Sequence, residues 1–183
     1  DNLPVEQSSL QRYEKDVVLF AKEILGIEPT LKQTFFFSEV ANNRATEFVW
    51  RNGEGCTTAL AILAVWRFLV FEDVDVKLFS RCLDSFSVVL RLLNNARKSN
   101  LFSATLQSLR QEGGRFFLGR KEYGHFLSVE RLPVNFIHLS GQMSKPYLLV
   151  DNGERVSERH LQVMMGSLSF PECRLVITLR GIA

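Results

Sequence analysis

The stretch Trp50-Arg51-Asn52-Gly53-Glu54-Gly55-Cys56-Thr57-Thr58 decides the fold of this 183-residue chain, because it joins two apolar segments of different kinds. Before it, Glu47–Trp50 is short and apolar, as in a buried strand. After it, the residues from Thr57 onward are apolar on nearly every side, which predicts a helix packed inside an α/β domain. The two glycines between them indicate a tight turn. We call Arg51–Thr58 the glycine loop.

A glycine turn between a buried strand and a buried helix aims backbone N–H groups at a bound anion, which is how nucleotide hydrolases hold phosphates. Against the pattern G-x-x-x-x-G-K-[ST], Gly55 aligns with the second glycine, Thr57 with the hydroxyl residue and Trp50 with the first glycine. Cys56 stands where the pattern has lysine, so a cation must come from elsewhere, and Arg51 is the nearest candidate. For the loop alone, an ordinary turn without a ligand stays open.

A second element is the apolar strand Tyr147–Val150, which ends in Asp151. In phosphate-loop hydrolases an aspartate at this place holds Mg²⁺, and a glutamate that orients water usually follows it. Asn152 occupies the glutamate position here. Glu154 lies two residues further on; it is either a catalytic acid or an acid that leads into the next helix.

A third element is Leu175-Val176-Ile177-Thr178, an apolar strand that ends in a hydroxyl residue. Thr178 is then in position to sense the γ-phosphate beside Asp151. The order of glycine loop, strand with Asp151 and strand with Thr178 indicates a nucleotide site more strongly than any one of them.

The rest of the chain alternates helices with strands. Periodicity predicts helices over Leu10–Leu25, Leu31–Ala41, Ser85–Lys98, Ser103–Gln111 and Ser157–Leu168. It predicts strands over Val76–Ser80, Val134–Leu139 and Arg174–Thr178, with short strands near Phe116-Phe117 and Phe126–Val129 and a turn at Gly113-Gly114. This alternation predicts an α/β fold with a mostly parallel central sheet flanked by helices. With the glycine loop added, the expected architecture is of the P-loop NTPase (ASCE/RecA-like) kind.

Composition agrees with one globular domain, since 46% of residues are hydrophobic and 23% are charged. The apolar run Ala59–Phe71 contains Arg67 and is shorter than the roughly 18 to 20 residues that span a bilayer. Asp1–Gln7 lacks the features of a secretory signal. Three cysteines without CxxC spacing favour a reducing compartment over a disulfide framework or zinc cluster. We expect one ATPase-like domain over residues 1–183 of a longer protein, with a helical segment at 1–45 and an α/β core at 46–183.

Charge is concentrated in the middle of the chain, although the net charge is only +2. Between Arg91 and Arg131 there are eight basic residues against three acidic ones: Arg91, Arg97, Lys98, Arg110, Arg115, Arg120, Lys121 and Arg131, with Glu112, Glu122 and Glu130. Such a stretch is either a solvated surface or the footprint of a polyanion.

The histidines and the cysteine of the glycine loop give little indication of a catalytic role. His125, His138 and His160 are dispersed, which favours packed or solvated side chains over ligands or bases. Cys56 begins a helix, where thiol pKa values fall, so a cysteine nucleophile is a remote alternative.

Several segments together resemble the N-terminal ATPase domain of viral large terminase subunits, the motors that package DNA into procapsids. The segments are Phe20–Pro29 with Leu31-Lys32-Gln33, Trp50–Leu60, Lys77–Ser80, Tyr147–Asp151 and Val176–Gly181. The resemblance spans nearly the whole chain.

The resemblance implies roles for particular residues. Gln33 would contact adenine. The phosphates would be bound by Arg51 and the rest of the loop, that is Asn52, Gly53, Glu54, Gly55, Cys56, Thr57 and Thr58. Thr57 and Asp151 would hold Mg²⁺, and Thr178 would couple hydrolysis to movement. The arginine finger has no clear counterpart, and the candidates are Arg115, Arg120 and Arg131.

It also implies ATP and Mg²⁺ as cofactors, with double-stranded DNA, the portal protein and the small terminase subunit as partners. The expected assembly is a homo-oligomeric ring in the host cytoplasm, transiently at the procapsid portal, without membrane contact. Because Cys56 and Asn152 depart from the pattern, two alternatives stay open: a nucleotide-binding or structural module with little hydrolysis, and a helicase-type ATPase.

Overall fold

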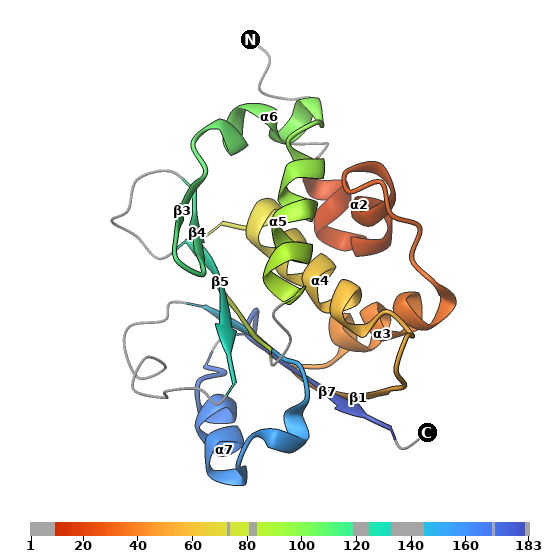
Figure 1. Ribbon diagram of the computed structural model, residues 1–183, viewed down its shortest axis with the longest axis vertical. Coiled ribbons are helices and arrows are strands. Elements are labelled where there is room, and N and C mark those ends of the chain that lie inside the picture. The colour runs from red at the N-terminus through yellow and green to blue at the C-terminus, as the bar shows by residue number, and fades with distance from the viewer. Residues whose placement is uncertain are drawn as a thin grey trace.

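A seven-stranded sheet, in which Tyr147–Val150 and Leu175–Ile177 are continuous apolar runs, forms the centre of the computed structural model, which describes residues 10–72, 74–80, 84–118, 125–132, 145–169 and 171–181 (Figure 1). The strands are β1 (Ala45–Trp50), β2 (Asp75–Ser80), β3 (Arg110–Glu112), β4 (Arg115–Phe117), β5 (Phe126–Arg131), β6 (Pro146–Val150) and β7 (Arg174–Arg180). Their order is β1-β7-β6-β2-β5-β4-β3. The first five in that order are parallel, and β4 and β3 add an antiparallel edge. The predicted fold class is therefore confirmed.

Helices cover both faces of this sheet. They are α2 (Val17–Glu23), α3 (Leu31–Asn42), α4 (Cys56–Val70), α5 (Asp84–Ala96), α6 (Asn100–Gln107) and α7 (Glu158–Gly166), with a 3₁₀ turn η2 (Gly153–Arg155). In Figure 1, α2 to α6 lie on one side of the sheet and α7 lies on the other. Because side chains alternate along a strand, Tyr147 and Leu149 join the core under α4, whereas Leu148 and Val150 pack in a smaller core with Met164 of α7.

The helix after the glycine loop is buried on nearly all sides, as predicted. Residues from Ala59 to Val65 are at most 1% exposed, so α4 is the central helix of the larger core. None of the helices in the described ranges has the length and apolarity that crossing a membrane requires.

The predicted helix over Leu10–Leu25 is wrong in one respect: Asp16 interrupts it. Residues 10–15 are helical, and α2 begins at Val17. Asp16 has an extended backbone, and its carboxylate accepts a hydrogen bond of 2.9 Å from the Leu19 backbone N–H. The apolar periodicity continues across Asp16, so it does not reveal the break. The break arises because Asp16 leaves the helical backbone conformation and caps the next helix.

The predicted helix from Ser103 to Gln111 is wrong at its end. Helix α6 stops at Gln107, and Arg110–Glu112 forms β3, which pairs with β4 across the predicted turn. Gly113 of that turn has φ of +59°, which favours glycine. The strand predicted over Val134–Leu139 lies outside the described residues. The remaining predicted helices and strands within the described residues are confirmed, with ends that differ by at most two residues.

Candidate functional site

The carboxyl ends of four parallel strands meet at one edge of the sheet. In the order β1-β7-β6-β2, β1 leads into the glycine loop and β6 leads into Asp151. Strand β7, which contains Thr178, lies between them. The topology therefore brings together the three segments that the sequence analysis singled out.

The glycine loop leaves the start of α4 open. Gly53 and Gly55 have φ of +83° and +84°, and Gly55 caps α4 without any side-chain hydrogen bond. The starts of four other helices are instead closed by side chains, those of Asp16, Thr30, Ser99 and Ser157. The uncapped N–H groups of α4 carry its positive dipole end, which suits an anion.

Helix α3 holds the loop through Gln33, which is 4% exposed. Its side-chain oxygen accepts from the Thr30 backbone N–H at 2.9 Å and completes a capping box. Its Nε2 donates to the Gly55 carbonyl oxygen at 3.0 Å. In this arrangement both ends of the Gln33 amide are engaged with the protein itself.

Helix α3 also contacts the loop through Lys32. Its ammonium pairs with Glu54 and lies 5.2 Å from the centre of the Trp50 ring. The Glu54 carboxylate also accepts from the Arg51 backbone N–H at 2.7 Å. The Lys32 hydrogen bond, followed by the Arg51 backbone bond, lowers the pKa of Glu54. The Glu54 carboxylate therefore binds the backbone of its own loop and Lys32 of α3.

Asp151 is completely buried at the centre of the site. Its Oδ1 accepts from the Thr178 hydroxyl at 3.1 Å, and its Oδ2 accepts from the Ser80 hydroxyl at 3.3 Å. Nη2 of Arg180 donates to Oδ1 at 3.0 Å and to Oδ2 at 3.3 Å. The ends of β2 and β7 thus place three side chains on the one carboxylate that follows β6.

The first residue of α4 contacts the same carboxylate. The Cys56 thiol lies 3.7 Å from Oδ1 of Asp151, and no hydrogen bond joins Thr57 to Asp151 among the described residues. Burial first, and then the Asp151 charge, raise the pKa of Cys56 to about 12. This corrects the expectation that the helix start lowers it, because the thiol is only 2% exposed and faces an anion.

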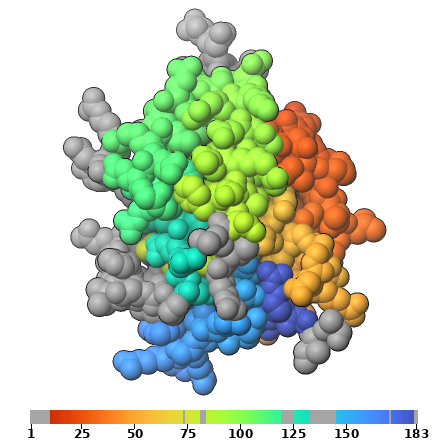
Figure 2. Space-filling model, viewed as in Figure 1, coloured from red at the N-terminus to blue at the C-terminus, as the bar shows by residue number. Residues whose placement is uncertain are grey.

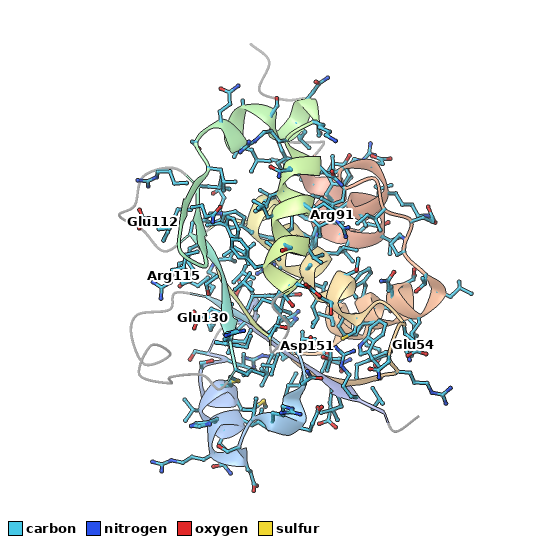
Figure 3. All side chains as sticks on the ribbon, in the orientation of Figure 1. Glu54, Arg91, Glu112, Arg115, Glu130 and Asp151 are labelled. Carbon is cyan, nitrogen blue, oxygen red and sulfur yellow. The ribbon has the colours of Figure 1, made fainter. Side chains whose placement is uncertain are left out.

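The segment after Asp151 turns sharply. Asn152 has φ of +62°, and its side-chain oxygen accepts from Nε of Arg180 at 2.8 Å. Gly153 packs so tightly on β7 that a Cβ there would stand 2.1 Å from the Ile177 side chain. Glu154 follows in η2 and is exposed. Figure 3 labels Asp151, which follows β6, and Glu54, which lies in the glycine loop.

The remaining predicted residues are more peripheral. Arg51 and Asn52 are exposed, and Thr57 and Thr58 are half-buried in the first turn of α4. Of the arginine-finger candidates, Arg115 and Arg131 are exposed and Arg120 lies outside the described residues.

Two histidines have structural contacts. His125 stacks on Phe68 and shares a hydrogen bond of 2.8 Å with its carbonyl oxygen. His160 contacts Ser157, the cap of α7, at 2.9 Å. His138 lies outside the described residues.

Three residues of the site have no role in the sequence analysis: Lys32, Ser80 and Arg180. Ser80 and Arg180 are the last residues of β2 and β7. Their position at strand ends is the signal that could have found them, once the strand order was known. For Lys32 no such signal exists, because its partner Glu54 lies 22 residues away.

A parallel sheet, a glycine loop that leads into a buried helix, and a buried aspartate at a nearby strand end together define the P-loop NTPase fold. Known structures share it. The ATPase domain of the large terminase of Thermus phage P74-26 matches with a TM-score of 0.56 at 12% identity, over 88% of this chain and 69% of that chain. An arginine-to-alanine mutant of that domain matches with a TM-score of 0.62 at 13% identity, over 86% and 67%.

The large terminase of bacteriophage HK97 matches with a TM-score of 0.56 at 13% identity, over 92% of this chain and 37% of that chain. At such identities the likeness concerns the fold, and it confirms the resemblance at that level. No protein-family model and no curated protein matches the sequence.

Proposed function

We propose that the chain is the ATPase domain of a large terminase subunit, which couples ATP binding and hydrolysis to movement of double-stranded DNA into a viral procapsid. One observation carries the proposal: the buried carboxylate of Asp151 contacts the first residue of the helix behind the glycine loop and the hydroxyl of Thr178. In a nucleotide motor these groups connect the phosphate site with the element that responds to hydrolysis. The proposed setting is a ring on the procapsid portal in the host cytoplasm, with the portal protein and the small terminase subunit as partners.

The residues present fit a nucleotide with Mg²⁺. The uncapped start of α4, with Gly53 and Gly55 before it, suits phosphate oxygens. Asp151 and the hydroxyl of Thr57 are hard oxygen donors of the kind that Mg²⁺ prefers. When bound, the metal would neutralise phosphate charge. Glu154 would act as the catalytic acid only if η2 bent toward the loop.

The basic middle of the chain supports a DNA-contacting role. Its described basic residues Arg91, Arg97, Lys98, Arg110, Arg115 and Arg131 are all exposed. In Figure 2, α5, α6 and the β3–β4 hairpin occupy the upper part of one face. Figure 3 shows Arg91 on α5 and Arg115 at the start of β4 in the hairpin. A double-stranded DNA would be bound mainly by its phosphates here, with a strong salt dependence.

A binding and hydrolysis experiment tests the proposal. The chain should bind a fluorescent ATP analogue, and the full protein should hydrolyse ATP with Mg²⁺ and double-stranded DNA. Asp151→Ala should abolish hydrolysis, whereas Glu158→Ala, at an exposed acid in the first turn of α7, should not. Absence of nucleotide binding, or an Asp151→Ala protein as active as the wild type, would rule the proposal out.

A nucleotide-binding module with little hydrolysis is the second candidate, and Cys56 and Asn152 favour it. Restoring both pattern residues, with Cys56→Lys and Asn152→Glu, should raise hydrolysis if the rest of the pocket is competent. A double variant that binds ATP but hydrolyses no more than the wild type would favour the module. A strand-unwinding assay separates the remaining helicase alternative.

A further inference from the structure

Arg180 lies on the strand between the one that leads into the glycine loop and the one that leads into Asp151. It is the last residue of β7, where it pairs in register with Trp50, the residue before the glycine loop. The next residue, Gly181, donates its backbone N–H to the Trp50 carbonyl oxygen at 2.8 Å. The backbone of Arg180 is therefore held one strand away from both the loop and Asp151.

The guanidinium of Arg180 forms hydrogen bonds with Asp151 and with Asn152, the residue that follows it. Its Nη2 contacts Asp151 and its Nε donates to Asn152 at 2.8 Å. The side chain is 28% exposed, whereas that of Asp151 is 1% exposed. The remaining nitrogen, Nη1, forms no hydrogen bond with any of the described residues, so it is free to donate to a ligand at the site.

The two departures from the phosphate-loop pattern meet at this arginine. Asn152, which replaces glutamate, accepts its hydrogen bond. Cys56, which replaces lysine, lies 3.7 Å from the same Asp151 oxygen that Arg180 contacts at 3.0 Å. A lysine at position 56 would bring its ammonium toward that oxygen, and the chain has a guanidinium there instead.

We propose that Arg180 supplies the cation that the glycine loop lacks and that it binds the phosphates of the nucleotide. This inference rests on the proposed function and names a residue for it that the pattern does not contain. A guanidinium suits the task because it is always charged and presents several donors to phosphate oxygens. In the state described here, Arg180 neutralises Asp151; with a nucleotide, Nη1 and then Nη2 turn toward the phosphates.

Two other cations of the described residues lie near the loop, and both are less suitable. Lys32 is already paired with Glu54 of the loop. Arg51 is exposed, and among the described residues its side chain forms no hydrogen bond or ion pair. Among the described residues, Arg180 is the cation that contacts Asp151, and it does so at the same oxygen that Cys56 of α4 contacts, which makes it a stronger candidate than Arg51.

Binding of a fluorescent ATP analogue, with and without Mg²⁺, tests this role independently of hydrolysis. The main variant is Arg180→Gln, which removes the charge but keeps amide donors for Asp151 and Asn152. We expect about 10- to 100-fold weaker binding, the usual loss of a charge-assisted hydrogen bond. Arg180→Lys should retain part of the affinity. Arg159→Gln, on the exposed face of α7, is the matched control and should bind normally.

The decisive variant combines Arg180→Gln with Cys56→Lys. If Arg180 replaces the missing lysine in function, the added lysine should restore binding to within about threefold of the wild type, which corresponds to about 0.65 kcal/mol in binding free energy. Thermal unfolding of each variant checks that it is folded.

Two results would overturn the inference, and they are distinguishable. If the wild type binds the analogue and Arg180→Gln binds it equally well or more tightly, Arg180 is only the structural partner of Asp151. If the wild type itself binds no nucleotide, the proposed function fails and the role of Arg180 fails with it.

Discussion

The side-chain amide of Gln33 donates to the carbonyl oxygen of Gly55 at 3.0 Å and so ties the start of α3 to the residue that caps α4. The other end of the same amide accepts from the Thr30 backbone. A role in reading adenine, which the family resemblance implies, would require Gln33 to release one of these bonds. The geometry favours a residue that shapes the glycine loop.

Gln33→Ala should therefore lower the free energy of unfolding by about 1–2 kcal/mol, through loss of the capping box and of the loop bond. It should weaken the binding of ATP and GTP analogues by similar factors, because the loop serves both. Chemical denaturation and nucleotide titration measure the two effects. Gln162→Ala, at an exposed position of α7, is the control. A loss confined to ATP would contradict the loop role and support adenine contact.

A second prediction concerns the two glycines of the loop. Both have φ near +84°, but they differ in their surroundings: a Cβ on Gly55 would stand 2.7 Å from Nε2 of Gln33, whereas a Cβ on Gly53 would meet nothing within 4 Å. Gly53→Ala should cost about 1–2 kcal/mol from the left-handed backbone alone. Gly55→Ala should cost more, about 2–4 kcal/mol.

Adding Gln33→Ala separates the cost of the left-handed backbone from the cost of the clash with Gln33. The pair Gly55→Ala and Gln33→Ala should destabilise by less than the sum of the single changes, since the clash is then removed. The same addition to Gly53→Ala should be additive. Equal costs for the two glycine variants would show that the Gln33 contact has no energetic weight.

Local patterns account for the part of this structure that was predictable. The strand before the glycine loop, the buried helix α4 after it and the strand that ends in Asp151 each contain an apolar run next to a turn. Their meeting at one edge follows from the geometry of parallel strands. Thr178 reaches Asp151 for the same reason, because it stands near the end of the strand between them.

What could not be predicted depends on individual side chains and on strand order. The contact of Arg180 with Asp151 requires that β7 lie beside β6 and that a long side chain turn back across the strand end. The pairing of Lys32 with Glu54 joins two separate elements. The pKa of Cys56 reverses its expected direction, because burial outweighs the helix dipole when the thiol also faces a carboxylate.

That reversal gives a third prediction, on thiol reactivity. With a pKa of about 12, the fraction of Cys56 present as thiolate near neutral pH is about a thousandfold lower than for an ordinary thiol. In the folded protein, iodoacetamide should therefore leave Cys56 unmodified over a time that labels the urea-unfolded chain completely. Peptide mass spectrometry reads the result.

Asp151→Asn is the informative companion to this labelling. It removes the second cause of the raised pKa but leaves the first, burial, in place, so Cys56 should stay nearly unreactive. Rapid labelling of Cys56 in the folded wild type would show instead that the thiol is accessible and ionised, and would reopen the cysteine nucleophile.

The last prediction concerns alkaline stability and Tyr147, whose ring is 2% exposed at the start of β6. Burial raises the pKa of this phenol to about 12, against a partial opposing effect of Arg67, whose guanidinium lies 5.2 Å from the ring. Because the folded-state pKa lies above the unfolded value of about 10, folding favours the protonated phenol. Its contribution is complete below about pH 10 and is lost as the pH rises from there through about 12.

Tyr147→Phe keeps the ring and removes the ionisation. Between about pH 9 and pH 11.5 the wild type should lose about 2 kcal/mol more of its free energy of unfolding than Tyr147→Phe does. Urea unfolding at both pH values measures the difference. Tyrosinate absorbance of the folded wild type should likewise show one phenol that ionises only together with alkaline unfolding. Identical pH profiles for the two proteins would mean that Tyr147 ionises freely in the folded state, and hence that the base of β6 opens to water.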